Sequence, residues 1–260
     1  MSSDTSNNFT EAILLGGRVR SFQPAKGYRT AIDAVMLAAA VPARESERVL
    51  DIGTGVGVTA FCLAARVYGI HVTGLELQSP LVALASRGVI ANGFENRVNI
   101  ITADLLDPPP SLEAASFDHV MANPPYATAG SGNPPPDPIK AAAMVEGRAK
   151  LADWLRFAAA MVKPGGSVTM IHRAERQDEV TSGLLDVGCG ALEVLGLAPK
   201  PGGIAKRVIV RGWKGREAES ITHPNLILHV ANEQSSGHPG HRPAYTTAAE
   251  AVLRDGESLL

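Results

Sequence analysis

From Arg48 onward, short apolar segments alternate with segments in which apolar residues recur at helical spacing. Strands are expected at residues 48–52, 71–75, 98–103, 117–122 and 167–172, with further candidates at 192–197, 207–211 and 226–230. Strands that alternate with helices favour a parallel sheet covered on both faces, because each helix carries the chain back to the start of the next strand. The sequence therefore predicts an α/β fold with a doubly wound, mostly parallel sheet.

The chain has 260 residues, which is enough for one large α/β domain, and no linker or internal repeat divides it. We expect a single domain with four parts: a disordered tail over 1–8, a hairpin and helix over 9–44, a core over 45–216 and a strand and helix over 217–260. Thr30 is predicted to cap the first helix, with Asp33 as its capping-box partner. Residues 127–138 are expected to form an irregular loop of the kind that often binds or covers substrate.

The segment Asn123-Pro124-Pro125-Tyr126 ends the apolar run at 117–122 abruptly. Two consecutive prolines lack N–H donors and fix φ near about −65°, so the chain turns rigidly out of the sheet. This turn presents an amide side chain, a proline carbonyl and an aromatic ring at one strand end. An exocyclic amino group on a flat ring needs two acceptors and a surface for stacking. The segment therefore predicts a binding site for such a group.

Composition and charge narrow the functional classes. With 24 Lys and Arg against 26 Asp and Glu, the net charge is −2, so contact with nucleic acid would depend on local patches. No segment has the pattern of a signal peptide or the length of a membrane span, which predicts a soluble cytoplasmic protein without membrane contact. Cys62 and Cys189 are expected to be free thiols, and no metal site is expected because the histidines lack ligand spacing.

Glycines at 53, 55 and 57 follow the first core strand directly, where they let a ligand approach the start of a helix. The pattern also satisfies the dinucleotide fingerprint, and Glu76 suits the hydroxyls of a ribose in either interpretation. Asp51 favours a ligand that carries an ammonium group over a pyrophosphate. Asp104, at the end of the third strand, can accept a hydrogen bond from an adenine amino group. Together with Asn123, these residues favour S-adenosylmethionine over a nicotinamide dinucleotide.

With these motifs the chain resembles the class I S-adenosylmethionine-dependent methyltransferases. More narrowly, it resembles the bacterial tRNA(Val) adenine N6-methyltransferases, which modify the adenine next to the anticodon. The narrower resemblance rests on the stretch from Phe22 to Ala39, in which a Phe-Gln element precedes a Thr-Asp pair and a helix rich in Leu and Ala. It implies a Rossmann-like sheet of seven strands with an antiparallel last strand, and S-adenosylmethionine as cofactor. It also implies methyl transfer to the N6 amino group of adenine in RNA, most simply tRNA.

The resemblance also implies roles for single residues. Asp51, Gly53, Gly55 and Gly57 would line the methionine part of the cofactor, Glu76 and Leu77 its ribose, and Asp104 and Leu105 its adenine. Gly27, Thr30 and Asp33 would close the methionine end. Asn123 and the carbonyl of Pro124 would bind the target amino group beside Pro125, and Tyr126 would stack on the base. The further residues expected to contact the substrate are Tyr28, Arg29, Lys206 and Arg207.

Several alternatives stay open at this point. The four-residue motif equally suits an rRNA adenine N6 or guanine N2 methyltransferase, or a glutamine N5-methyltransferase, because a primary amide offers the same two N–H donors. A nicotinamide-dependent oxidoreductase and a non-catalytic RNA-binding module are alternatives from other classes. The basic cluster between Lys200 and Arg216 is either a phosphate-binding patch or an ordinary solvated face. A monomer is expected.

Overall fold

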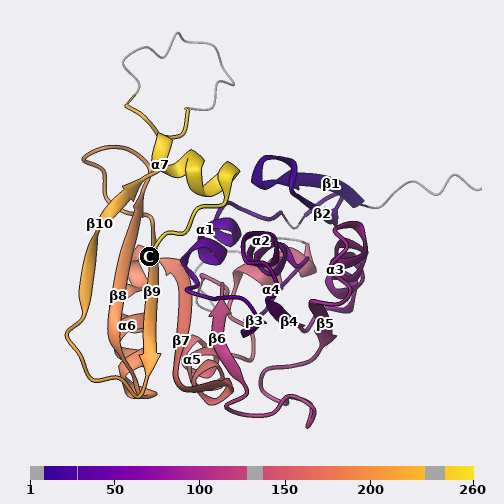
Figure 1. The fold of residues 1–260 in the computed structure, drawn as a ribbon, viewed down its shortest axis with the longest axis horizontal. Helices are drawn as coiled ribbons and strands as arrows, with labels where there is room; N and C mark the ends of the chain where they lie inside the picture. Colours follow the sequence, from indigo (N-terminus) through magenta and orange to yellow (C-terminus); the bar gives the residue numbers. More distant parts are fainter. Residues whose placement is uncertain (1–8, 28, 128–136, 232–243) are drawn as a thin grey trace, which may run out of the picture.

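The computed structural model describes residues 9–27, 29–127, 137–231 and 244–260 and is built around a central eight-stranded sheet. The strands lie in the order β10-β8-β9-β7-β6-β3-β4-β5 (Figure 1). Their bounds are β3 (Arg48–Ile52), β4 (His71–Glu76), β5 (Val98–Thr102), β6 (Phe117–Ala122), β7 (Val162–Arg173), β8 (Cys189–Ala198), β9 (Arg207–Lys214) and β10 (Ile221–Ile227). Only β9 runs antiparallel to its neighbours within this sheet, which confirms the predicted mostly parallel α/β fold.

The predicted count of seven strands is one too few, because β10 pairs with β8 and adds an eighth strand at the edge. The expected edge strand at 226–230 starts earlier, at Ile221. Most of β10 is exposed or half-buried, so its sequence lacks the apolar alternation of a covered strand. Pro224 lies where the register with β8 shifts, a position that an edge strand tolerates because no ladder hydrogen bond is required there.

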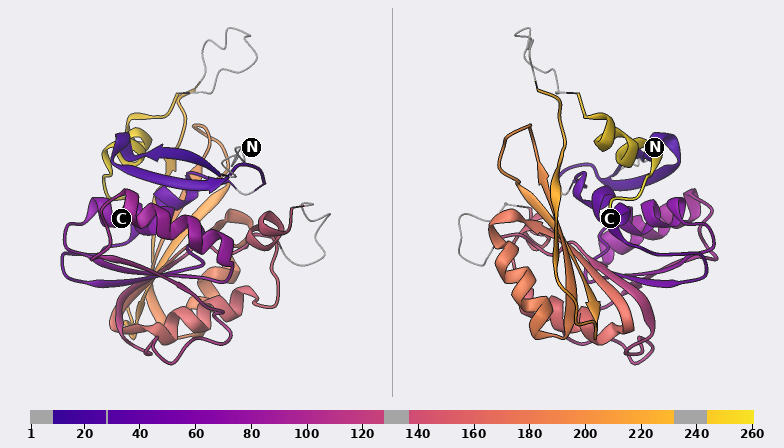
Figure 2. Two further views of the ribbon diagram at one scale, coloured as in Figure 1. Left: turned by 90° about the vertical axis from the view of Figure 1, so that its right-hand side faces the viewer. Right: turned by 60° about the vertical axis from the view of Figure 1, so that its left-hand side comes forward.

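Helices cover both faces of the sheet (Figures 1 and 2). Neighbouring residues of β3 point to opposite faces, so that Val49 joins the cluster around α1 (Asp33–Ala40) and α2 (Val58–Arg66), whereas Leu50 joins the cluster around α5 (Leu151–Met161) and α6 (Gln177–Asp186). The remaining helices are α3 (Ser79–Ala91), α4 (Pro138–Met144) and α7 (Thr247–Glu250). The sequence did not predict α4 or α6.

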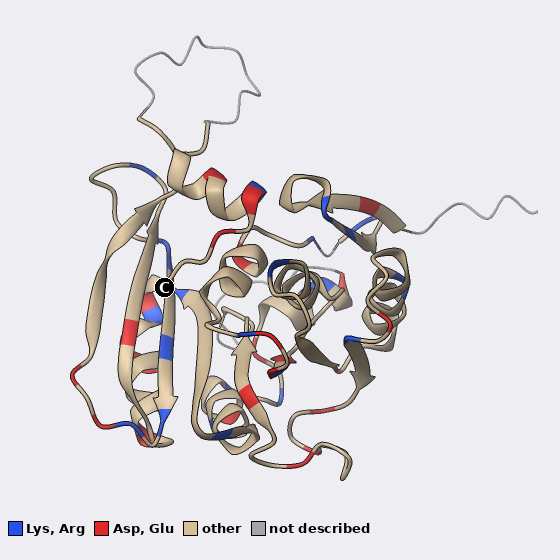
Figure 3. Ribbon diagram, viewed as in Figure 1, with Lys and Arg blue, Asp and Glu red and all other residues tan. Residues whose placement is uncertain are grey.

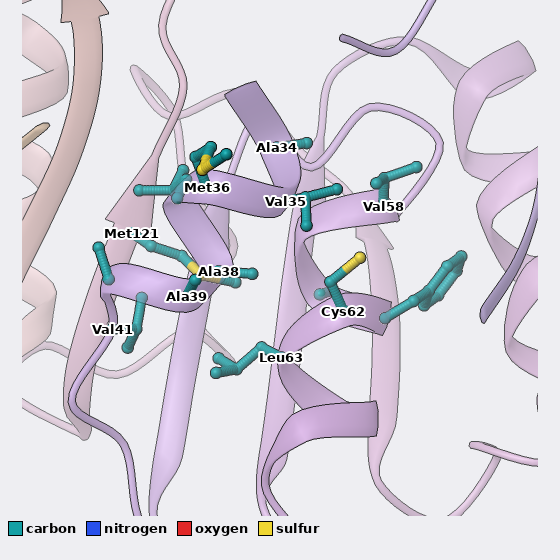
Figure 4. Close-up of a cluster of buried hydrophobic side chains, with 14 of the residues drawn as sticks. Ala34, Val35, Met36, Ala38, Ala39, Val41, Val58, Cys62, Leu63 and Met121 are labelled. Carbon is teal, nitrogen blue, oxygen red and sulfur yellow. The ribbon is translucent and has the colours of Figure 1, made fainter. Parts of the chain in front are cut away.

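All eight residues of α1 are buried, and α1 packs against α2 (Figure 4). The small side chains of Ala34, Ala38 and Ala39 belong to this contact together with Cys62 and Leu63 of α2. Small residues let two helices approach closely, which fixes the position of the first turn of α1 relative to the sheet. Asp33 lies in that turn.

The predicted capping role of Thr30 is wrong. The helix begins at Asp33 with Ile32 as its N-cap, no side chain caps it, and the Oγ1 atom of Thr30 is buried without a hydrogen-bond partner. Ile32, and not Thr30, occupies the N-cap position, so the hydroxyl of Thr30 does not cap the first helical N–H groups. The carboxylate of Asp33 is consequently available for other partners.

The two ends of the described chain meet above α1. The hairpin of β1 (Phe9–Leu14) and β2 (Val19–Pro24), in indigo, lies beside the yellow C-terminal segment (Figures 1 and 2). The guanidinium of Arg18 donates to the carbonyl of Arg254 at 3.1 Å, and the N–H of Leu259 donates to the carbonyl of Ala39 at 2.9 Å. The predicted tail at 1–8, residues 128–136 of the predicted loop and residues 232–243 lie outside the described part of the chain.

Candidate active site

A cavity of about 510 Å³ opens at the carboxyl ends of β3, β4, β5 and β6. This is the end of an open α/β sheet where ligands bind. Most of the residues that the sequence predicted for the site line this cavity, and these are Arg29, Thr30, Asp33, Gly53, Gly55, Glu76, Leu77, Asp104, Leu105, Asn123, Pro124, Pro125, Tyr126 and Arg207. The structure therefore brings the two predicted halves of the site, cofactor and substrate, into one cavity.

The glycine turn forms one wall of the cavity. Gly53 has φ +67°, and a Cβ atom there would lie 2.6 Å from the ring of Trp154, so the position requires glycine on two counts. The N–H of Gly55 donates to Glu76 Oε2 at 2.9 Å, and the N–H of Gln78 donates to Glu76 Oε1 at 2.8 Å. Glu76 thus holds the turn in place while its carboxylate faces the cavity.

Asp51 lies behind this wall. Its side chain is 1% exposed, and the hydroxyl of Thr54 donates to its Oδ2 at 2.6 Å. Burial, together with the nearby carboxylate of Glu76, raises the pKa of Asp51 to about 7. Burial also raises the pKa of Glu76, against the effect of its backbone donors. Two desolvated carboxyl groups side by side favour a cationic ligand, which would offset their mutual repulsion.

Asp104 lies at the opposite end of the cavity, after β5. Its Oδ1 accepts from the N–H of Leu106 at 2.9 Å, and its Oδ2 lies 3.4 Å from the exposed guanidinium of Arg148. Trp154 lines the same cavity, and its indole N–H is buried without a hydrogen-bond partner. Asp104 therefore offers an acceptor to a purine amino group, whereas the ring of Trp154 lies against Gly53 in the glycine turn.

The predicted catalytic segment follows β6 directly. The hydroxyl of Tyr126 lies 2.6 Å from Asn123 Oδ1 and 2.7 Å from Asp33 Oδ2. The Nε atom of Arg207 donates to the same Asp33 oxygen at 2.8 Å, and its guanidinium carbon lies 4.5 Å from the centre of the Tyr126 ring. One face of that ring is therefore covered by Arg207. A base that stacks on Tyr126 would use the opposite face or take the place of the guanidinium.

His172 at the end of β7 supports the segment from behind. It is fully buried, and its ring meets the ring of Tyr126 edge-on at 5.2 Å. Burial and the nearby charge of Arg176 lower the pKa of His172 to about 4, so the imidazole is neutral near pH 7. Its Nδ1 accepts the N–H of Arg173 at 2.9 Å, which leaves the ring proton on Nε2.

Some predicted site residues lie elsewhere. Gly57 is the N-cap of α2 and packs against Phe61, whereas Lys206 is exposed in the loop before β9. A Cβ atom on Gly27 would lie 2.6 Å from the carboxylate of Asp137, so this glycine allows a close approach of two loops outside the cavity lining. Tyr28 lies outside the described residues. No group of three or more His, Cys, Asp or Glu residues within the described ranges is arranged to hold a metal ion.

Sequence analysis missed several residues of the site. Thr54, Trp154 and His172 lie next to the predicted residues, but only Thr54 is near them in the sequence. Thr54 lies inside the glycine turn that the motif already marked, so that turn was the available signal. The other two come from segments after the four-residue motif, and no spacing in the sequence connects them to it.

Comparison with known proteins agrees with this geometry. The chain matches the family model described as methyltransferase small domain over residues 30–178, more than half of its 260 residues. A tRNA1(Val) (adenine(37)-N6)-methyltransferase of Aeromonas salmonicida is 28% identical over 200 residues, which are 76% of this chain and 81% of that protein. An rRNA N(6)-adenosine-methyltransferase of Caenorhabditis elegans is 26% identical over 137 residues, or 52% of this chain and 56% of that protein.

A solved structure of similar fold is that of a predicted O-methyltransferase of Agrobacterium tumefaciens. It superposes with a TM-score of 0.68 at 26% identity and covers 88% of this chain and 98% of its own. The family match spans the glycine turn, Glu76, Asp104 and the segment from Asn123 to Tyr126. The chain belongs to the methyltransferase small domain family and is an S-adenosylmethionine-dependent methyltransferase.

Proposed function

We propose that this enzyme methylates the exocyclic N6 amino group of adenine in RNA, and that its substrate is a tRNA. The observation that carries the proposal is the position of Asn123 Oδ1 in the cavity lining, 2.6 Å from the hydroxyl group that the aromatic ring of Tyr126 carries. An amide oxygen beside an aromatic ring fits an amino group on a flat heterocycle. The relatives named for tRNA and rRNA adenine support adenine as that heterocycle.

The residues around the cavity suit each part of the cofactor. S-adenosylmethionine supplies a methyl group on a positively charged sulfur atom. Asp51 and Glu76 provide negative charge near the glycine turn, where the ammonium group and the ribose hydroxyls would lie. Asp104 and Leu105 line the part of the cavity after β5, where adenine would lie. The cavity volume is in the range of small-molecule sites.

The amino nitrogen of adenine is a poor nucleophile because its lone pair is delocalised into the ring. Asn123 Oδ1 and the carbonyl of Pro124 would accept its two N–H groups, hold the nitrogen pyramidal and so direct the lone pair toward the methyl group. After transfer, the nitrogen carries an acidic proton that passes to water. No strong general base is required, and the neutral imidazole of His172 is too buried to serve as one.

Positive charge around the cavity supports an RNA substrate. Four basic residues line the cavity, of which Arg148 is paired with Asp104 and Arg207 with Asp33; the other two are Arg29 and Lys140. Basic residues in this position would attract an RNA backbone. The loop between β8 and β9 adds Lys200 and Lys206 at the same end of the sheet, where it carries blue residues in Figure 3. Such local patches offset the overall charge of −2.

The proposed function also includes an oligomeric state and a place in the cell. We propose a monomer that needs no metal ion and acts on tRNA in the cytoplasm. Among the described residues, no helix is long and apolar enough to cross a membrane. The C. elegans relative favours one second candidate, an rRNA adenine.

Radiolabelled methyl transfer tests the function directly. Total RNA and total protein from a strain that lacks the gene are incubated with the enzyme and labelled S-adenosylmethionine, and the products are digested to nucleosides and amino acids. We expect label in N6-methyladenosine of the tRNA fraction. Label in N6-methyladenosine of rRNA alone would support the second candidate, whereas label in N5-methylglutamine alone would refute both.

A further inference from the structure

The hydroxyl group of Tyr126 lies between two acceptors that compete for one proton. Asp33 Oδ2 is 2.7 Å away and Asn123 Oδ1 is 2.6 Å away. A phenol has a single O–H donor, so it can donate to only one of these oxygens at a time. Burial and the carboxylate of Asp33 raise the pKa of Tyr126, which keeps the hydroxyl protonated at all ordinary pH values.

The choice between the two acceptors matters for Asn123. When the hydroxyl donates to Oδ1, it uses one of the two lone pairs of this oxygen and orients the amide toward Tyr126. The proposed function requires the same oxygen to accept an N–H group of the substrate. An oxygen that already accepts the Tyr126 hydroxyl has only one lone pair left and its direction is constrained, so it accepts the substrate amino group better when the hydroxyl donates elsewhere.

Asp33 provides the alternative acceptor. Its side chain is 8% exposed, and it is held by the Nε–H of Arg207 at 2.8 Å in an ion pair. A hydrogen bond to a carboxylate is stronger than one to a neutral amide. Asp33 is also fixed in space, because the rest of α1 is buried against α2 and the C-terminal segment.

We propose that Asp33 is a positioning residue for methyl transfer, which accepts the hydrogen bond of the Tyr126 hydroxyl and so frees Asn123 Oδ1 for the amino group of the substrate. The inference rests on the proposed role of Asn123. Asp33 acts through Tyr126 and does not touch the substrate. This assignment differs from the role expected from the sequence, in which Asp33 closes the methionine end of the cofactor.

A double-mutant cycle between Asp33 and Tyr126 tests the proposal. The variants are Asp33→Asn, Tyr126→Phe and the combination, measured for kcat and KM with the RNA substrate and for the Kd of S-adenosylmethionine. Asp33→Asn replaces a charged acceptor with a neutral one, so we expect kcat to fall about tenfold while the tyrosine is present. In the Tyr126→Phe background, which has no competing hydroxyl, the same change should alter kcat less than about twofold.

Three results would overturn the proposal. An equal loss of kcat in both backgrounds would mean that Asp33 has a structural role only. An unchanged kcat in Asp33→Asn would mean that Asp33 has no role in methyl transfer. A weaker Kd for S-adenosylmethionine that accounts for the loss would place Asp33 in the cofactor site. If Asp33→Asn does not fold, Asp33→Glu displaces the carboxylate from Tyr126 and the same comparison of backgrounds decides.

A failure of this proposal can be told apart from a failure of the proposed function. If the wild-type enzyme methylates glutamine in protein and no adenine in RNA, the proposed function fails. The cycle is then run with the protein substrate, because its amide presents the same N–H donors to Asn123 Oδ1.

Discussion

At the scale of single residues, Asn123 separates binding of the cofactor from transfer of the methyl group. We expect Asn123→Ala to lower kcat about 10²- to 10³-fold, because it removes an acceptor that acts on the reacting nitrogen. The Kd for S-adenosylmethionine should stay within about threefold, since Asp51, Glu76 and Asp104 are unchanged. Calorimetric titration and single-turnover methylation measure the two quantities.

The matched control is Asn99→Ala, an exposed asparagine within β5. It should leave both kcat and the Kd unchanged. A folded Asn123→Ala variant that loses cofactor binding and transfer together would contradict this division of roles.

The raised pKa of Asp51 predicts how binding of S-adenosylmethionine depends on pH. Its pKa, raised to about 7 by burial, means that the carboxyl group becomes neutral as the pH falls through 7. Only the ionised form attracts the ammonium group of the cofactor. The affinity for S-adenosylmethionine should therefore be highest above pH 7 and should fall as the pH drops below 7. We expect the Kd for S-adenosylmethionine to rise severalfold, and by at most about tenfold per pH unit, between pH 7 and pH 5.5.

The variant Asp51→Asn isolates this effect, because it has no titratable group at the position. It should bind more weakly at pH 7, and its Kd should not change over the same pH range. A wild-type Kd that is independent of pH would contradict the assignment of the ammonium group to Asp51.

Single residues also show where sequence reasoning reaches its limit. Asp51, Glu76, Asp104 and Asn123 were predictable because each lies at or just after the carboxyl end of a strand, and neighbouring parallel strands end on the same side of the sheet. Arg207 was expected to contact substrate, but its ion pair with Asp33 joins residues 174 positions apart. No local pattern encodes such a pair.

At the scale of elements, the loop between β8 and β9 offers two exposed lysines for contact with an RNA backbone. Lys200 and Lys206 are exposed on it, next to Arg207 at the cavity. We expect the double variant Lys200→Ala/Lys206→Ala to weaken RNA binding about equally for all sequences. The slope of log K against log salt should decrease by about one per lysine. Filter binding at several salt concentrations measures both.

A pair of basic residues near the amino ends of the parallel strands serves as a control with the same change of charge. Arg44 and Arg216 line a second cavity near the start of β3 and the end of β9. Their replacement by alanine should leave RNA affinity and its salt slope nearly unchanged. An equal loss in both double variants would show that RNA binding depends on overall charge and not on this loop.

Elements differ in how well the sequence predicts them. The strands β3, β4 and β6 are mostly buried and read as apolar runs, so their approximate bounds were predicted. The partly buried edge strand β5 was also predicted, whereas β7 begins at Val162, five residues before its predicted start. Helix α6 buries only Val180 and Leu184, and β10 leaves most of its residues exposed or half-buried. Elements with so little buried surface carry a weak periodic signal, and their existence depends on the sheet against which they pack.

At the scale of the whole molecule, the contact between the N-terminal hairpin and the C-terminal segment connects the fold to the active site. The turn of the hairpin contacts the C-terminal segment, and that segment packs against α1, which carries Asp33 at its start. The sequence predicted a hairpin and a terminal helix but not their contact, because residues such as Arg18 and Arg254 are 236 positions apart. The position of the active-site wall thus depends on contacts between segments that are distant in the sequence.

The cofactor should therefore stabilise the whole molecule, because the strand ends, the glycine turn and the start of α1 all line one cavity. S-adenosylmethionine at a hundred times its Kd adds about 2.7 kcal/mol to the free energy of unfolding. For a domain of this size, that corresponds to a rise in Tm of roughly 5–10 °C. Differential scanning calorimetry with S-adenosylmethionine, with NAD and without ligand measures it. NAD is the control because the glycine turn alone also fits a dinucleotide, and Asp51 should repel its pyrophosphate. A rise in Tm with NAD and none with S-adenosylmethionine would contradict the assignment of the cavity.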